Sequence, residues 1–136
     1  MTLIINTAFK NKIFIALAEG EKFYKKSISR ARADRLLILI DKILKSKKMK
    51  MQEIKKIIVV SGPGSFTALR QGVLAANTLG FVLGVPAVGV RLDEFRNEKE
   101  LLAVGYKKIE KIRVGEMVLP FYGREPNITT PRISYV

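Results

Sequence analysis

One short stretch constrains the fold of this chain more than any other. Residues 59–80 read VVSGPGSFTALRQGVLAANTLG, which is an apolar strand, a loop rich in glycine, and then a helix with small residues. A strand that leads through such a turn into a helix is typical of α/β folds, in which helices join parallel strands. The loop either cradles a phosphate or only directs the helix that follows it.

The hydrophobic pattern places further elements around this unit. Residues 2–7, 12–18 and 22–28 predict three strands whose short polar turns require an antiparallel meander. Apolar residues at helical spacing predict a helix over residues 33–45, and the continuous apolar run at 56–60 predicts a central strand buried on both faces. The helix after the loop is expected over residues 65–83, because Gly84 and Pro86 would end it.

The remaining pattern completes the predicted fold. We expect a strand at 86–90, a third helix at 92–102 and a weak strand at 114–119, followed by a tail interrupted by proline. This order predicts an α/β fold with a mixed sheet, an antiparallel meander and flanking helices. It is the ribonuclease H-like half-unit of the actin, Hsp70 and sugar-kinase (ASKHA) superfamily. We expect residues 1–104 to form this domain and residues 105–136 to be a short C-terminal remnant and tail packed on it.

The amino-acid composition limits the kinds of functional site that this chain can form. The 136 residues include neither cysteine nor histidine, so the commonest metal ligands and the usual general base are missing, and we expect no metal site. No signal peptide or membrane span is visible, which predicts a cytoplasmic protein without membrane contact. The net charge of +13 favours contact with RNA phosphates, although dispersed lysines also fit a solvated surface.

The loop fits no standard phosphate-binding motif. No lysine follows Gly62 and Gly64 as a P-loop requires, and Thr67 stands where a dinucleotide motif has glycine. Ser65 or Thr67 would still cap the helix, and the backbone N–H groups at a helix start bind anions. The candidate anion-binding residues are therefore Ser61, Gly62, Gly64, Ser65 and Thr67.

The alternative role for the loop is to aim the helix at a partner. Ala68, Gly72, Ala75 and Ala76 lie on one helix face that is poor in side chains. Such a face lets another backbone approach closely, and packing on the chain's own sheet would explain it equally well.

Four segments resemble the TsaB/YeaZ family. SGPGSFTALRQGVLAANTLGFVLGVPAVGV resembles the family's GPGSFTGLR region, with Ala68 where glycine is usual. LIINTAFKNKIFIALAEGEKF fits its opening strands, although Asn6 replaces the usual aspartate before Thr7. RARADRLLILIDKIL is similar to its next helix, and LPFYGREPNI to its C-terminal segment. Family members usually carry a second lobe before that segment, so the chain resembles a minimal form of the family.

The resemblance implies a function. The family is regarded as a non-catalytic partner of a TsaD/Gcp-like subunit, which holds the metal and the threonylcarbamoyl-adenylate chemistry. Together with a TsaE-like ATPase, these proteins install t6A at position 37 of tRNA. Asn6 cannot supply the carboxylate that a cation site needs, so we expect a degenerate site here. No cofactor is expected in this chain, because ATP and metal would belong to the partner.

By the same resemblance, two long helices would pack against the partner as a four-helix bundle, and a homodimer would use the same helices. The expected partner-binding residues are Leu36, Leu37, Ile40, Ile43, Phe66, Leu69, Arg70, Gly72, Val73 and Ala76. Two alternatives stay open. One is a free-standing nucleotide-binding enzyme of the ASKHA superfamily, and the other is a basic RNA-binding module that contacts tRNA.

Overall fold

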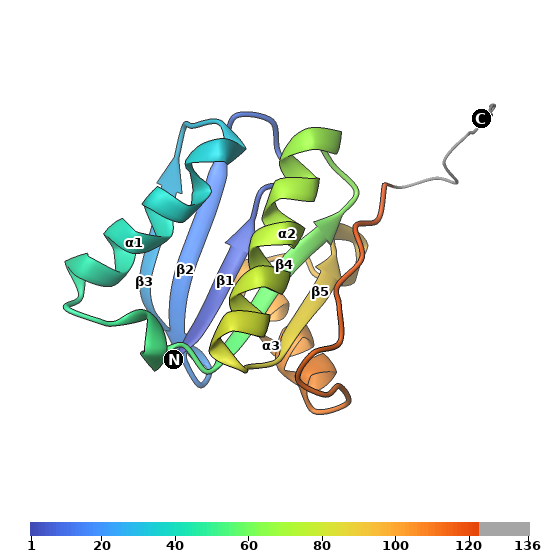
Figure 1. The fold of residues 1–136 in the computed structure, drawn as a ribbon. Coiled ribbons are helices and arrows are strands. Elements are labelled where there is room, and N and C mark those ends of the chain that lie inside the picture. The colour runs from blue at the N-terminus through green and yellow to red at the C-terminus, as the bar shows by residue number, and fades with distance from the viewer. Residues whose placement is uncertain (123–136) are drawn as a thin grey trace.

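A mixed sheet of five strands is the centre of the fold within residues 1–122, the part of the chain described in a computed structural model (Figure 1). β1 (Thr2–Asn6), β2 (Ile13–Glu19) and β3 (Lys22–Ser29) form the antiparallel meander. β4 (Lys56–Gly62) pairs parallel with β1, and β5 (Ala87–Arg91) pairs parallel with β4. The sheet order β3-β2-β1-β4-β5 confirms the predicted ribonuclease H-like half-unit.

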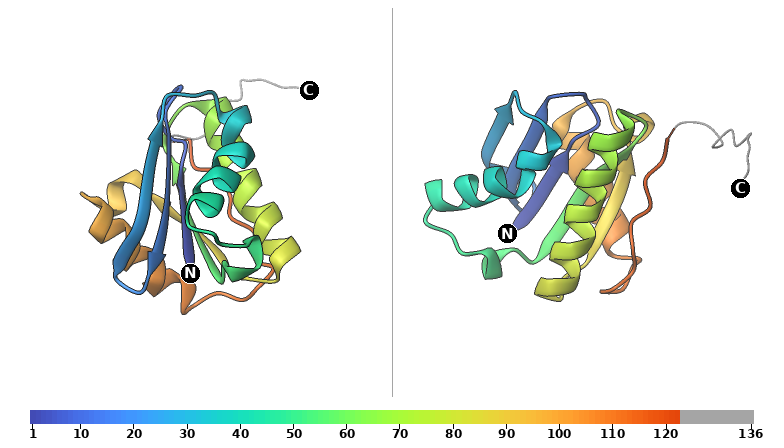
Figure 2. Two further views of the ribbon diagram at one scale, coloured as in Figure 1. Left: turned by 90° about the vertical axis from the view of Figure 1, so that its left-hand side faces the viewer. Right: turned by 45° about the horizontal axis from the view of Figure 1, so that its top comes forward.

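Helices cover both faces of this sheet. α1 (Leu36–Ser46) and α2 (Phe66–Leu83) lie on one face, and α3 (Glu98–Ile109) lies on the other (Figure 2). Single 3₁₀ turns precede α1 (Ala33–Arg35), β4 (Met51–Glu53) and α3 (Leu92–Glu94). β1 and β4 read as continuous apolar runs because a helical layer packs on each side of them.

The predicted boundaries are confirmed for most elements and wrong for two. The third helix begins at Glu98 instead of residue 92, because Asn97 accepts a hydrogen bond from Glu100 N at 2.9 Å and caps it there. The predicted strand at 114–119 is absent: this segment pairs with a side chain of α2 rather than with the sheet.

The division of the chain after residue 104 stays a prediction. That position lies within α3, and residues 123–136, which hold most of the predicted tail, lie outside the described residues. None of the described helices combines the length and the hydropathy needed to cross a bilayer.

Candidate functional site

The loop that joins β4 to α2 is packed on both sides by the chain itself. Gly64 lies against the backbone of Ala8, whose oxygen accepts a hydrogen bond from Ser65 N at 3.0 Å. Gly62, with a φ of 130°, lies against the carbonyl of Phe121. A Cβ at either glycine would collide with that backbone, so both glycines serve a close internal approach. The close packing at both glycines is therefore explained by the chain's own fold.

The predicted side-chain cap of α2 is absent. Ser65 is the N-cap residue, but its side chain makes no capping hydrogen bond, and Thr67 lies one residue inside the helix. Both residues line a shallow hollow together with Lys10, Arg32 and Gln71. The anion-binding role of the loop residues stays a prediction.

The side-chain-poor face of α2 packs inside the molecule, on the end of β1. Thr7 is fully buried there, and its Oγ1 donates a hydrogen bond to Ala68 O at 2.7 Å. Gly72 faces Thr7 so closely that a Cβ would collide with Thr7 Oγ1. The expectation that Gly72 faces a partner is therefore corrected. Asn6 is also engaged locally, because its Oδ1 accepts from Ala8 N at 2.9 Å.

Most of the predicted partner-binding residues belong to the chain's own core. The apolar stripe at helical spacing faces the sheet, as an amphipathic helix on a sheet requires. It buries seven of the ten: Leu36, Ile40, Ile43, Leu69, Gly72, Val73 and Ala76. Leu37, Phe66 and Arg70 remain exposed, and the Arg70 guanidinium lies 5.5 Å from the centre of the Phe66 ring.

The same helices carry a second apolar face that the sequence analysis missed. Leu74 is 65% exposed and Phe81 is 82% exposed, on the side of α2 away from the sheet. The signal was present in the sequence, because α2 carries apolar residues outside the stripe that packs on the sheet. We call the exposed set the helix-pair surface: Leu37 and Ile38 of α1 with Phe66, Leu74, Phe81 and Val82 of α2.

A segment after α3 ties the loop to α2. In this C-terminal strap, residues 117–122, Val118 N donates to Asn77 Oδ1 at 2.8 Å and Asn77 Nδ2 donates to Val118 O at 2.9 Å. Phe121 N donates to Ser61 O at 2.7 Å, and the Tyr122 ring stacks on Phe66 with 4.4 Å between centroids. The strap thus runs beside α2 to the loop (Figure 1).

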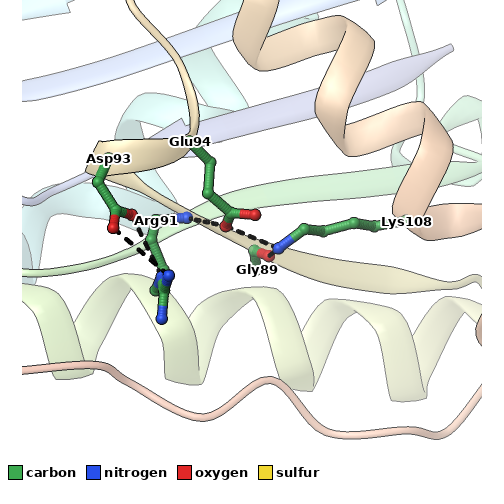
Figure 3. A network of polar contacts seen from close by, with 5 residues as sticks. All are labelled: Gly89, Arg91, Asp93, Glu94 and Lys108. Carbon is green, nitrogen blue, oxygen red and sulfur yellow. Dashed lines mark hydrogen bonds and ion pairs between the residues drawn. The ribbon is translucent and has the colours of Figure 1, made fainter.

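A polar network fixes the adjacent edge of the sheet (Figure 3). Glu94 accepts from Lys108 Nζ at 2.7 Å and from Arg91 N at 2.9 Å, and Lys108 also donates to Gly89 O. Burial of Glu94 alone would raise the pKa of its carboxyl, but these hydrogen bonds outweigh burial and lower that pKa. The Arg91 guanidinium lies 4.8 Å from the centre of the Phe121 ring, which connects the network to the strap.

Most of the carboxylates in the described residues form such ion pairs. Arg91 pairs with Asp93, Arg96 with Glu100, and Lys26 with Glu98. Across residues 1–122, no group of three or more metal-ligating side chains lies close enough together to hold an ion.

Comparison with known proteins identifies the family. The family model described as "TsaD: tRNA N6-adenosine threonylcarbamoyltransferase" matches residues 24–93, just over half of the chain. TsaB of Bacillus subtilis, a tRNA threonylcarbamoyladenosine biosynthesis protein, is 38% identical over 56 residues, covering 41% of this chain and 24% of that protein. The chain belongs to the family that this model describes.

Two further relatives match a similar length of the chain. A tRNA N6-adenosine threonylcarbamoyltransferase of Listeria monocytogenes is 39% identical over 62 residues, which is 46% of this chain and 18% of that protein. An uncharacterized protein of Mycobacterium tuberculosis is 37% identical over 62 residues and is matched over 29% of its length. The chain therefore matches less than a third of the length of each of these three relatives.

The fold agrees with a solved TsaB/YeaZ structure. YeaZ from Pseudomonas aeruginosa superposes with a TM-score of 0.60 at 22% identity, covering 66% of this chain and 43% of that one. The superposition supports the fold class, although the sequence identity of 22% is low.

Proposed function

We propose that this chain is a non-catalytic scaffold subunit of the bacterial machinery that makes threonylcarbamoyladenosine at position 37 of tRNA. It would bind the TsaD-like catalytic subunit, and a TsaE-like ATPase would complete the machinery. The named relatives support the pathway, since they are a threonylcarbamoyltransferase and a threonylcarbamoyladenosine biosynthesis protein.

The observation that carries the proposal is the helix-pair surface. Its apolar side chains lie on two helices that share one face of the sheet, so a second helix pair would bury them as a four-helix bundle. Exposed apolar groups in such a cluster mark an interaction site. Complete burial of a Leu or Phe side chain contributes about 1.5–3 kcal/mol, so a few such residues would support a stable complex.

The end of β1 supports a non-catalytic role. Asn6 and Thr7 use their side chains to hold the chain's own backbone, and the loop after β4 is packed against Ala8 and Phe121. ATP and metal would then be bound by the partner subunit.

Co-purification with the TsaD-like protein of the same genome tests the proposal. Size-exclusion chromatography with light scattering would compare the wild type with Leu74→Glu, which places a charge on the helix-pair surface at a residue that is 65% exposed and so outside the core. We expect loss of the complex, because a buried unpaired carboxylate is strongly disfavoured. Val114→Glu, at a residue that is exposed but outside this surface, is the matched control.

Two results would contradict the proposal: no complex with the wild-type chain, or a complex that Leu74→Glu leaves intact. The same run without the partner reports whether the chain forms a homodimer through these helices. Gly72→Leu is unsuitable as a test, because the larger side chain would collide with Thr7 inside the fold.

A further inference from the structure

The face of the sheet opposite the helix-pair surface contains an open apolar hollow. α3 packs on β4 and β5 and leaves the neighbouring strands of that face partly uncovered (Figure 2). The hollow has a volume of about 160 Å³, and its apolar lining is Phe9, Phe14, Ile28, Phe95 and Leu101. Phe9 lies in the β1–β2 connection and is 53% exposed, so its ring is available to a ligand.

A second hollow continues from the first and is basic. It shares Lys12 and Ile28 with the apolar hollow, has a volume of about 570 Å³, and is also lined by Lys10, Asn11 and Arg30. Among the described residues, none of these three cations has an acidic partner within ion-pair distance. We call the two together the aromatic–basic hollow.

The acidic side chains near these cations do not cancel that charge. Asp34 lines a neighbouring hollow together with Lys10, but its carboxylate pairs with Arg32 at 3.4 Å. Glu98 lines the apolar hollow, but its carboxylate pairs with Lys26 Nζ at 2.9 Å. Arg96, close by in sequence, is likewise paired with Glu100. Lys10, Lys12 and Arg30 therefore remain as uncompensated positive charges beside an exposed aromatic ring.

We infer that the aromatic–basic hollow binds single-stranded RNA. Proteins that bind single strands combine aromatic rings, on which bases stack, with cations that follow the phosphates. Here Phe9 supplies the ring, and Lys10, Lys12 and Arg30 supply the charge. A second copy of this chain would bring the same cations to the contact and be repelled. Duplex RNA would offer phosphates but no unstacked base for Phe9.

This inference does not rest on the proposed function. The helix-pair surface lies on the α1/α2 face and the aromatic–basic hollow on the α3 face, so a partner subunit and an RNA strand would not compete for the same residues. Each surface can fail its test without affecting the other.

Binding of a single-stranded RNA of about 10 nucleotides, which carries 2-aminopurine in place of one adenine, tests the inference on the full-length chain. Fluorescence anisotropy gives the affinity, and quenching of the 2-aminopurine reports stacking. We expect Phe9→Ala to weaken binding about fivefold and to abolish the quenching, because one base–aromatic stack is lost. Tyr24→Ala, at another exposed aromatic residue beside a lysine, is the matched control.

The charge contribution is tested with two triple variants. Replacing Lys10, Lys12 and Arg30 by Gln should reduce the slope of log affinity against log salt by about 2, since each neutralised phosphate contributes about 0.7 for a single strand. The control replaces Lys42, Lys55 and Lys111, which are exposed and outside the hollow, and should leave the slope unchanged. Circular dichroism would verify that all variants fold.

Several outcomes would overturn the inference. These are no RNA binding by the wild type, equal effects of the two triple variants, or unchanged affinity and quenching in Phe9→Ala. Tighter binding of an acidic peptide of equal charge, also lost in Phe9→Ala, would make the hollow a protein-docking surface instead.

Discussion

At the scale of single residues, the contact between α2 and the end of β1 depends on Gly72. The helix approaches so closely that Thr7 fills the space where any larger residue would place its Cβ. Thr7 is buried and held by its hydrogen bond to Ala68 O, so it has little freedom to move aside. Glycine inside a helix costs about 1 kcal/mol relative to alanine, and this close packing offsets that cost.

Gly72→Ala should therefore destabilise the fold although alanine favours helices. We expect a net loss of about 1–3 kcal/mol in the free energy of unfolding, measured by urea denaturation, because overpacking exceeds the gain in helix propensity. Thr7→Ala removes the colliding atoms, so the double variant should show a positive coupling energy. Additive effects of the two substitutions would contradict this account of the contact.

The sequence identified the small residues here but not their neighbour. Spacing alone showed that Ala68, Gly72, Ala75 and Ala76 share a face, and left open whether a partner or the sheet covers it. Deciding between these two possibilities requires knowing that Thr7, 65 residues away in the chain, packs on this face. The spacing of apolar residues gives no information about such a contact. By contrast, the stop at Gly84 was predictable because it is a local effect: its φ of 66° suits glycine.

At the scale of elements, one side chain of α2 holds the C-terminal strap at Val118. Asn77 both donates to and accepts from the backbone of Val118, as a neighbouring strand would. The apolar run at 114–119 predicted a strand because its residues favour one, but its backbone pairs with this amide instead of the sheet. Hydrophobic periodicity cannot show that a side chain, and not a neighbouring strand, will bond to this backbone.

Asn77→Ala should release the strap locally. Both hydrogen bonds to Val118 would be lost, which costs about 1–2 kcal/mol in the free energy of unfolding. Hydrogen exchange should be faster at the amides of Val118 and Phe121, while the strands keep their protection. Thr78→Ala, at the exposed neighbouring position, is the control and should leave exchange unchanged. Unaltered exchange in Asn77→Ala would show that other contacts hold the strap.

At the scale of the whole molecule, the sequence predicted the inner architecture better than the outer surfaces. The strands and helices were predictable because their buried side chains recur at the regular spacing of a strand or a helix. The predicted partner-binding residues were chosen by the same apolar spacing, so most of them are core residues such as Ile40 and Leu69. The exposed Leu74 and Phe81 lie outside the stripe that packs on the sheet, so finding them requires knowing which side of α2 faces it.

The Glu94 network makes the stability of the whole chain depend on pH, because it joins β5, α3 and, through Arg91, the strap. Its lowered pKa means that the folded state favours the charged carboxylate. The stabilisation is thus complete above the ordinary value of 4.5 and is lost as the pH falls through the lower value in the folded state. Glu94→Gln should cost about 1 kcal/mol at neutral pH, an estimate already reduced for partial solvent exposure.

Urea unfolding of the wild type and Glu94→Gln between about pH 3 and pH 7 measures this contribution. The difference between them should stay constant at higher pH and shrink as the solution becomes more acidic than pH 4.5. Glu100→Gln is the matched control, because the pKa of Glu100 is also lowered by hydrogen bonds from Arg96, but at an exposed site that solvent screens. A difference for Glu94→Gln that does not change with pH would mean that the carboxylate acts through packing and not through its charge.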